Sequence, residues 1–196
     1  MQKAKTTSTP VFKVEKTIRH GNTHSDTVFF DDQELLKDLM KYKIIKIKYW
    51  YGTLVPAGVV NGIKLTFKNI ETGKIVETES RYGNHQLRGS NEIQLGDNEY
   101  ITYVDMRVGS IVDRLVFKTS TGRTITIGGT GGEYRSFSMD GKFVVGTFGG
   151  WGGHLHNFGL YLADPKDVIY ARRRPYLLMK ESLLRNQDLL AQIKGD

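Results

Sequence analysis

Apolar and polar residues alternate along most of the chain between residues 42 and 164. In the stretch KIIKIKYW, residues 43–50, isoleucines and a tyrosine alternate with lysines. This two-residue period is typical of a strand with one face buried and the other in water. Further segments of strand character lie at residues 60–70, 74–80, 91–95, 100–108, 113–119, 123–129, 142–150 and 157–163. Short strands with no helical segments between them predict an all-β sandwich or barrel.

Turn signals separate several of these strands. The sequences ETGK at 71–74, STGR at 120–123 and MDGK at 139–142 each carry a Thr-Gly or Asp-Gly pair. Glycine accepts the positive φ that tight hairpin turns require. The turns therefore favour antiparallel pairing of strands that follow one another in the sequence.

One segment before the strands has a different period. DDQELLKDLMKY, residues 31–42, begins with aspartates and carries Leu35, Leu36, Leu39 and Met40 at helical spacing. An aspartate ahead of such a pattern is a helix start signal. We therefore expect a short helical insert within residues 31–41.

The segment after residue 164 is also helical in character. Leu183, Leu190 and Ile193 share one helical face, Pro175 suits the first turn of the helix, and Gly195 suits its end. A helix with an apolar stripe outside a sheet must pack on its own domain or on a partner. We favour the partner. The predicted partner-binding residues are Arg172, Arg173, Arg174, Leu183, Leu190 and Ile193.

These patterns divide the chain into three parts. Residues 1–15 form a polar N-terminal arm, residues 16–164 a β domain, and residues 165–196 a basic, amphipathic helical tail. The length of 196 residues, with 39% hydrophobic and 11% aromatic residues, suffices for one globular domain. The β domain is expected to keep its thermal stability when the chain is cut after Asp167.

Composition also limits where the protein works. No apolar run is long enough to span a membrane, and no apolar stretch follows the basic start MQKAKTTSTP, so we expect no membrane span and no secretory signal. The expected location is intracellular, either cytoplasmic or associated with the cytoskeleton or an organelle. The absence of cysteine excludes disulfides and thiolate zinc sites.

The net charge of +7, from 28 basic and 21 acidic residues, leaves several partners open. Much of the basic excess lies at residues 13–19, 37–48 and 172–174. Solubility is the favoured explanation of this charge. Binding of nucleic acid or an anionic membrane rests on charge alone and ranks last among the functions considered.

Two glycine-rich loops, GGTGG at 128–132 and GGWGG at 149–153, are candidate binding elements. A phosphate-binding P-loop needs a lysine and a following helix, whereas strands follow both loops here. A dinucleotide fingerprint fails for the same reason. What remains is an approach of backbone N–H groups to a hydroxylated ligand such as a sugar, which glycine permits because it has no Cβ.

Metal and enzyme chemistry are disfavoured. His154 and His156 could share one strand face, but the spacing of His20, His24 and His85 nominates no third ligand. No Gly-x-Ser-x-Gly elbow and no recognisable pair of carboxylates is present. The sequence therefore predicts a non-catalytic protein with no metal and no cofactor.

Several motifs resemble those of the jacalin-related lectins. They are E-I-x-L at 92–95, Y-I-x-x-V at 100–104, L-x-F-x-T at 115–119, G-x-F-G-G-x-G-G at 146–153 and F-G-x-Y at 158–161. HGNTHSDTVFFDD at 20–32 is similar to the opening glycine-rich loop of that family. The resemblance implies a β-prism, in which three four-stranded Greek-key sheets are related by pseudo-threefold symmetry. It also implies that the glycine-rich loops sit at corresponding turns.

The resemblance also nominates a carbohydrate site and puts it in doubt. The family signature is Gly-x-x-x-Asp directly before the last strand, and the matching positions here are Gly152, Gly153, His154, Leu155 and His156. Histidine replaces the aspartate whose carboxylate accepts sugar hydroxyls, and neutral imidazole offers only one acceptor. In the opening loop only Gly21 of a glycine pair remains. Trp151 and Tyr134 are candidates for stacking on a sugar; for Trp151 a plug over the end of the barrel is an equal alternative.

Two functions follow from these observations. The first is a lectin-fold domain that lost its sugar site and serves as a structural or protein-interaction subunit of a larger eukaryotic assembly, such as a cytoskeletal, ciliary or organellar complex. The missing aspartate, the helical insert and the tail favour it. The alternative is a working lectin that binds carbohydrate of the mannose type through the glycine-rich loops.

Overall fold

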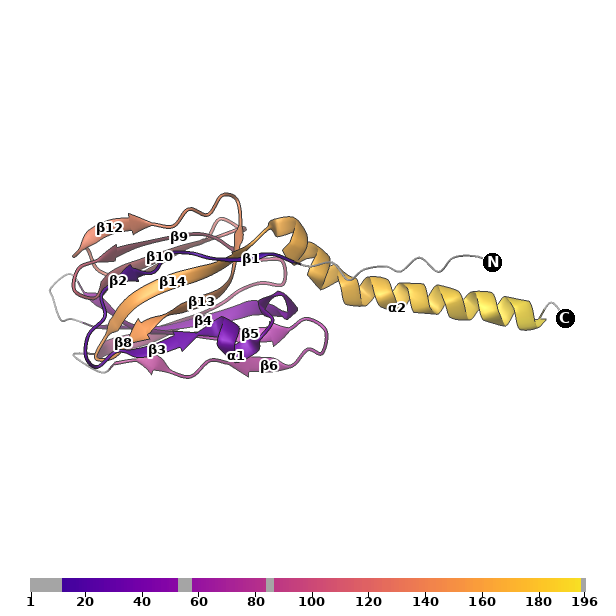
Figure 1. Cartoon of the computed structure of the whole chain (residues 1–196), viewed down its shortest axis with the longest axis horizontal. Coiled ribbons are helices and arrows are strands. Elements are labelled where there is room, and N and C mark those ends of the chain that lie inside the picture. The colour runs from indigo at the N-terminus through magenta and orange to yellow at the C-terminus, as the bar shows by residue number, and fades with distance from the viewer. Residues whose placement is uncertain (1–11, 53–57, 84–86, 195–196) are drawn as a thin grey trace.

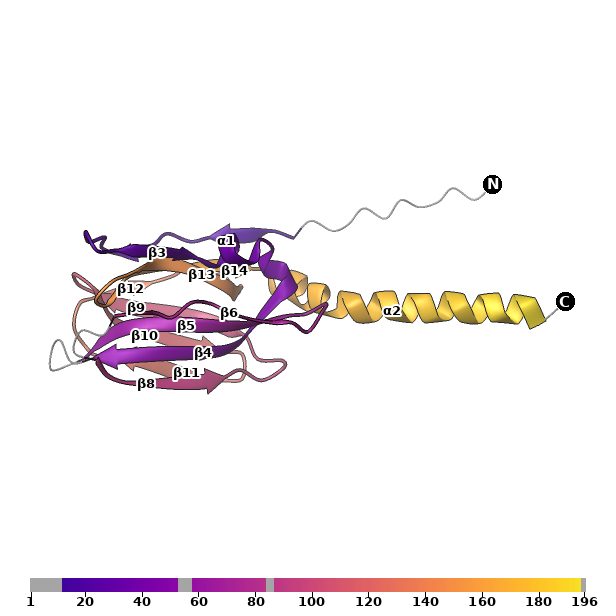
Figure 2. The same cartoon turned by 90° about the horizontal axis from the view of Figure 1, so that it is seen from below.

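The computed structural model describes residues 12–52, 58–83 and 87–194. A body of three antiparallel sheets carries one long helix, α2 (Pro165–Lys194), which points away from it (Figures 1 and 2). The predicted all-β β-prism with a helical insert and a C-terminal helix is confirmed.

Sheets B and C are built from consecutive segments. Sheet B has the order β6–β5–β4–β8, with β7 paired to β5, and sheet C has the order β11–β10–β9–β12. In each, the fourth long strand lies beside the first, which is the Greek-key arrangement. The strands of sheet B are β4 (Tyr42–Gly52), β5 (Val59–Asn69), β6 (Ile75–Glu77), β7 (Arg81–Tyr82) and β8 (Leu87–Gln94). Those of sheet C are β9 (Ile101–Val108), β10 (Val112–Thr119), β11 (Thr124–Gly128) and β12 (Glu133–Ser136).

Sheet A is assembled from segments far apart in the sequence. Its order is β1–β14–β13–β3, and the short β2 pairs with β14. Val14 lies opposite Ala163, and Val28 lies opposite Trp151. The strands are β1 (Val14–Lys16), β2 (His20–Gly21), β3 (Val28–Asp31), β13 (Phe143–Trp151) and β14 (Leu155–Ala163). The short β2 and β7 give two of the sheets a fifth strand beyond the four expected.

The core lies between the three sheets. Each sheet turns one face inward, as the two-residue period predicts. The rings of Phe117 on β10 and Phe158 on β14 meet edge to face with centroids 6.3 Å apart, which joins sheets C and A. The largest fully buried side chains include Ile47, Ile63, Leu65, Phe67, Met106, Leu115, Phe117, Leu155 and Phe158.

The helical insert consists of two short helices. The first, α1 (Asp32–Leu36), begins where the Asp31 side chain accepts a hydrogen bond from the backbone N–H of Gln33. The second, a 3₁₀ turn η1 (Leu39–Lys41), is capped by Asp38 in the same way. Lys37, with φ of 64°, separates them. A short helix within residues 31–41 is thus confirmed, although it is interrupted.

A buried ion pair fastens the insert to the body. Asp32 accepts from the Arg81 guanidinium at 2.9 Å, and both side chains are almost fully buried. The second Asp32 oxygen accepts from the backbone N–H and the hydroxyl of Thr147. Arg81 also lies over the ring of Phe30, 4.1 Å from its centroid. The insert is therefore held by sheet A and sheet B together.

Helix α2 begins ten residues earlier than the sequence suggested. Pro165 occupies the first helical position, and the Asp164 side chain accepts from the N–H of Lys166, which caps the helix. Pro175 lies inside the helix, so its assignment to the start was wrong. Gly195, the expected end, lies outside the described residues. None of the described helices is long and apolar enough to cross a membrane.

The first turns of α2 belong to the body. Val168 and Ala171 are buried in the core, and the ring of Tyr170 lies 6.1 Å from that of Phe12. The expectation that nothing after Asp167 supports the β domain is therefore wrong for these turns. Beyond Pro175 the helix runs free of the body (Figure 1). Because proline lacks an N–H, the helix has one hydrogen bond fewer at this junction.

Candidate functional site

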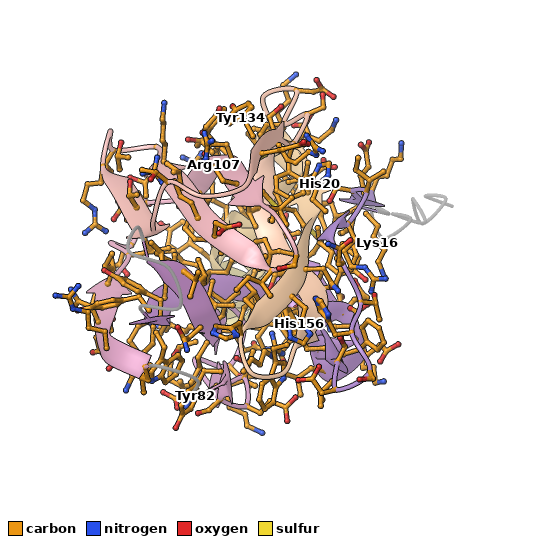
Figure 3. All side chains as sticks on the ribbon, turned by 90° about the vertical axis from the view of Figure 1, so that its left-hand side faces the viewer. Lys16, His20, Tyr82, Arg107, Tyr134 and His156 are labelled. Carbon is orange, nitrogen blue, oxygen red and sulfur yellow. The ribbon has the colours of Figure 1, made fainter. Side chains whose placement is uncertain are left out.

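The candidate sugar residues lie at the end of the body opposite α2, which faces the reader in Figure 3. There the opening loop, residues 20–27, lies against the turn between β13 and β14. Gly21 pairs with Asn157 and has φ of 109°. A Cβ on Gly21 would come within 2.4 Å of the carbonyl oxygen of His156. Glycine at position 21 is therefore required for the two segments to approach so closely.

His156, which replaces the expected aspartate, points into the protein. Its side chain is only 4% exposed, and its Nδ1 lies 2.7 Å from the Thr27 hydroxyl. That hydroxyl also accepts a hydrogen bond from the backbone N–H of His24, so the Thr27 side chain joins His156 to the opening loop.

Burial is the main cause that lowers the pKa of His156. The neighbouring Asp26 carboxylate opposes this shift, and the His24 ring, with its centroid 4.6 Å away, reinforces it. The balance favours neutral imidazole at pH 7. The ring is buried and its Nδ1 is engaged by Thr27, so it offers a ligand less than the two acceptor oxygens of the aspartate that it replaces.

Asp26 brings a carboxylate to the site from the opening loop. Its Oδ2 accepts a hydrogen bond from the backbone N–H of Gly153 at 3.3 Å, and its Oδ1 lies 3.9 Å from Nε2 of His156. The bond from Gly153 is the main cause that lowers the pKa of Asp26. The side chain remains 61% exposed. A carboxylate is thus present near the glycine-rich turn, but it occupies one of the backbone donors.

The turn itself uses a second donor. The N–H of Gly152 bonds to the carbonyl of His154 at 2.9 Å. A Cβ on Gly152 would lie 2.4 Å from Oδ2 of Asp26 and 2.6 Å from Cε1 of His156. Glycine here therefore makes room for the chain's own side chains. The N–H groups of Gly152 and Gly153 are therefore both engaged within the protein.

The other residues predicted from the sequence differ in how far they are exposed. His154 and Leu155 are buried, so only their main chains face the turn. Trp151 is half-buried and packs against the core, as the plug interpretation expects. Tyr134 on β12 is 52% exposed, with its hydroxyl 3.0 Å from that of Tyr103. Figure 3 shows Tyr134 well apart from His156. Gly21, Gly152, Gly153 and His156 are brought together, and Tyr134 is not.

The opening loop also contacts sheet C. Asn22 donates to the carbonyl of Gly109, and Nε2 of His24 lies 2.6 Å from the carbonyl of Ser110. Arg107 (Figure 3) donates to the carbonyls of Gly131 and Gly132 and so holds the GGTGG loop. Between these loops is an open cavity of about 430 Å³, lined by Gly21, Asn22, Val108, Gly109, Gly132, Glu133 and Arg135. Both glycine-rich loops thus end on the same face.

Sequence reasoning missed Asp26, Thr27 and His24. All three lie in HSDT, residues 24–27, and the only signal was that polar residues follow Gly21 in the opening loop. In the described part of the chain no three His, Cys, Asp or Glu side chains are close enough to hold a metal ion. His85 lies outside the described residues.

The predicted partner-binding residues all belong to α2. Arg173 is exposed and Leu183 is 54% exposed. The side chains of Arg172, Arg174, Leu190 and Ile193 lie outside the described residues. Tyr176, Leu177, Met179 and Leu184 are further exposed apolar side chains on the same helix. The two candidate surfaces therefore lie at opposite ends of the molecule.

Three antiparallel sheets packed around one core, with glycine-rich loops at one end, define the β-prism class of fold. The family model of the jacalin-like lectin domain matches residues 42–161. The chain therefore belongs to the jacalin-like lectin family, as the sequence motifs indicated.

Individual relatives are more distant. Jacalin-related lectin 35 of Arabidopsis thaliana is 33% identical over 108 residues, which is 51% of this chain and 23% of that protein. Malaysian banana lectin superposes with a TM-score of 0.62 at 20% identity over 78% of this chain and 99% of its own. AcmJRL, a mannose-binding jacalin-related lectin from Ananas comosus, superposes with a TM-score of 0.60 at 19% identity. The match covers 77% of this chain and 98% of AcmJRL. The chain spans about a quarter of the Arabidopsis relative.

Proposed function

We propose that this chain is a non-catalytic lectin-fold subunit that joins a larger intracellular assembly through α2. The observation that carries the proposal is the part of that helix beyond Pro175. It leaves the body and exposes large apolar side chains, among them Tyr176, Met179 and Leu183, which are 62%, 56% and 54% exposed. Soluble proteins rarely leave such side chains grouped in water without a partner. Cytoskeletal, ciliary and organellar complexes are the settings we consider.

The opposite end of the molecule supports the same proposal. His156 is buried where the family places its sugar-binding carboxylate, and Asp26 accepts from Gly153. Charge-assisted hydrogen bonds of that kind must be broken before a hydroxyl can use the donor. At one end of the protein, Asp26 thus bonds to the glycine-rich turn, and at the other end α2 exposes apolar side chains.

The test is the size of the native complex. The full chain and its Leu183→Glu variant are expressed with a tag in the source cells and compared by native size fractionation. We expect the full chain in a complex larger than itself and the variant released from it. Ser182→Glu adds the same charge at the adjacent exposed position and serves as the control. A full chain that migrates as a free monomer, or a Leu183→Glu variant that stays bound, contradicts the proposal.

Carbohydrate binding is the second candidate. AcmJRL, which has the same fold, is a mannose-binding lectin, and Asp26 offers an exposed carboxylate beside Gly153. A glycan array separates the candidates. We expect no micromolar binding by the full chain. Micromolar binding that Gly153→Asp abolishes would favour the lectin. Weak mannose binding gained by His156→Asp and not by His156→Asn would identify a decayed site.

A further inference from the structure

A cavity of about 600 Å³ lies where α2 leaves the body. The stacked rings of Tyr100 and Phe143, with centroids 4.5 Å apart, contribute apolar surface, and Ile169 and Arg173 of α2 line it from the helix side. Asp97, Asn98, Ser120 and Thr121 complete the lining. We call this the base cavity. An apolar chain that lies along α2 can therefore continue into a hollow on the body.

From the base cavity an apolar stripe runs along α2 at seven-residue intervals. Ile169, Tyr176 and Leu183 are spaced by seven and are 38%, 62% and 54% exposed. Met179, three residues after Tyr176, is 56% exposed. In the sequence Leu190 continues the seven-residue interval and Ile193 follows it by three positions, whereas the polar Arg172 and Asn186 occupy the other positions three residues after a member of the stripe. Apolar residues that recur at alternate spacings of three and four are the signature of a helix that packs on another helix.

Basic residues flank this stripe. Arg173 and Lys180 each follow a stripe residue by four positions, and Lys194 follows Leu190 in the same way. Glu181 and Asp188 fall one position further around the helix, away from the stripe. In paired helices the positions beside the seam select the charge of the partner. A partner helix with acidic flanks fits this arrangement.

A second copy of the chain fits less well. From Pro165 to Lys194 the sequence holds seven basic and three acidic residues, so two α2 helices would repel each other. In an antiparallel pair centred between these two residues, Arg173 of each copy would face Lys180 of the other. A membrane surface also fits less well, because membrane-bound helices present a broad apolar face. Here Lys180 and Gln187 interrupt any face wider than the stripe.

We propose that the base cavity and the α2 stripe bind one helical segment of a partner protein, apolar along its seam and acidic along its flanks. This inference rests on the proposed function and names the kind of partner that it requires. Leu183 contributes a central apolar contact, and Lys180 attracts acidic side chains of the partner.

The probe is a peptide of about three heptads with leucine at the seam and glutamate at the flanks. A matched peptide carries lysine at the flanks. Binding to the full chain is measured by fluorescence anisotropy at low and high salt. We expect the glutamate peptide to bind at least about tenfold more tightly than the lysine peptide, with the difference reduced by salt.

Two variants localise the contact. Leu183→Ser is expected to weaken binding of the glutamate peptide by about tenfold or more. Ser182→Ala, at the adjacent exposed position, is expected to leave that binding unchanged. Lys180→Glu is expected to shift the preference towards the lysine peptide. The proposal is overturned if the full chain binds both peptides equally. It is also overturned if Leu183→Ser binds the glutamate peptide as the full chain does and Lys180→Glu keeps the same peptide preference.

Other occupants give their own results. If the full chain sediments as a dimer and Leu183→Ser as a monomer, a second copy covers the stripe. If the chain binds anionic phosphatidylserine vesicles through Leu183 but neither peptide, a membrane does. Both results overturn the inference. If Leu183→Glu leaves the native complex while the glutamate peptide neither binds nor competes, the proposed function stands and the inference fails. If that variant stays bound, the proposed function itself fails.

Discussion

The two ends of this molecule differ in whether the side chains of their candidate surfaces have partners within the chain. At the loop end, two polar side chains have partners within the chain: His156 bonds to Thr27, and Asp26 accepts from Gly153. At the helix end, α2 exposes apolar side chains such as Tyr176 and Leu183 to water. The family resemblance directs attention to the loops. A group of exposed apolar side chains lies on the helix, where burial by a partner would be favourable.

The comparison separates two kinds of evidence. The loop end has the residue types of a binding site, but the N–H groups of Gly152 and Gly153 are already bonded within the chain. The helix end has no motif, yet it exposes apolar side chains such as Tyr176, Met179 and Leu183. A feature inherited with a fold is therefore a weaker indication of present function than surface that the chain leaves uncovered.

The largest expected effect concerns the boundary between body and free helix. A chain cut after Asp164 loses the buried Val168 and Ala171, so its free energy of unfolding should fall by about 2–4 kcal/mol. A chain cut after Arg174 keeps both residues and should change by no more than about 0.5 kcal/mol. Urea unfolding of the two truncations measures this. Equal stability of the two, or a large loss after Arg174, would break the division of α2 into two parts.

The next effect tests how closely the loop end is packed. Gly21→Ala should lower the free energy of unfolding by about 2–3 kcal/mol, since φ is 109° and the new Cβ meets the His156 carbonyl. Gly73 is the matched control, because it has φ of 74° and nothing within 4 Å. Gly73→Ala should cost about 1 kcal/mol. Similar losses in both variants would show that the opening loop yields easily and that the turn is not closed by it.

The third effect is a pH dependence at the loop end. Burial lowers the pKa of His156 below its ordinary value of 6.5, so the unfolded chain binds a proton more readily than the folded one. This residue's contribution to stability is complete above pH 6.5 and declines as the pH falls through that value towards the folded pKa. Urea unfolding between pH 7.5 and 5 should show a steeper decline for the native chain than for His156→Gln. Parallel curves would mean that His156 is accessible to water.

The smallest effect is expected at the helix end. Leu183→Ser should change the free energy of unfolding by less than about 0.5 kcal/mol, since the side chain is 54% exposed in the unbound chain. Thermal unfolding of the isolated protein checks this. A loss of more than about 1 kcal/mol would indicate that Leu183 packs within its own chain. The comparison between the two ends would then fail.

Most of the fold could be predicted from the sequence because its signals are local. The two-residue period marks strands such as β4, and the Asp-Gly and Thr-Gly pairs mark their turns. The start of α2 was wrong for a physical reason. Pro175 is a poor interior residue, so the pattern placed it at the start, whereas packing of Val168 and Ala171 on the body holds an earlier start.

Less of the candidate site could be predicted. The glycines and His156 are visible in the motif, but the partner of Gly153 is not, because Asp26 lies 127 residues away. Nothing in the sequence tells whether His156 points outward to a ligand or inward to Thr27. That orientation depends on the opening loop, whose path is set by contacts with two sheets.

The strand pairing of sheet A has a consequence for the order of folding. Strand β1 at Val14 pairs with β14 at Ala163, and β2 and β3 also pair with the last two strands, whereas sheets B and C close through nearby segments. Contacts between distant segments form slowly, because a long loop must first close. During synthesis the first strands must wait until residue 163 has emerged from the ribosome. The turn that holds Asp26 against Gly153 is therefore among the last parts of the molecule to form.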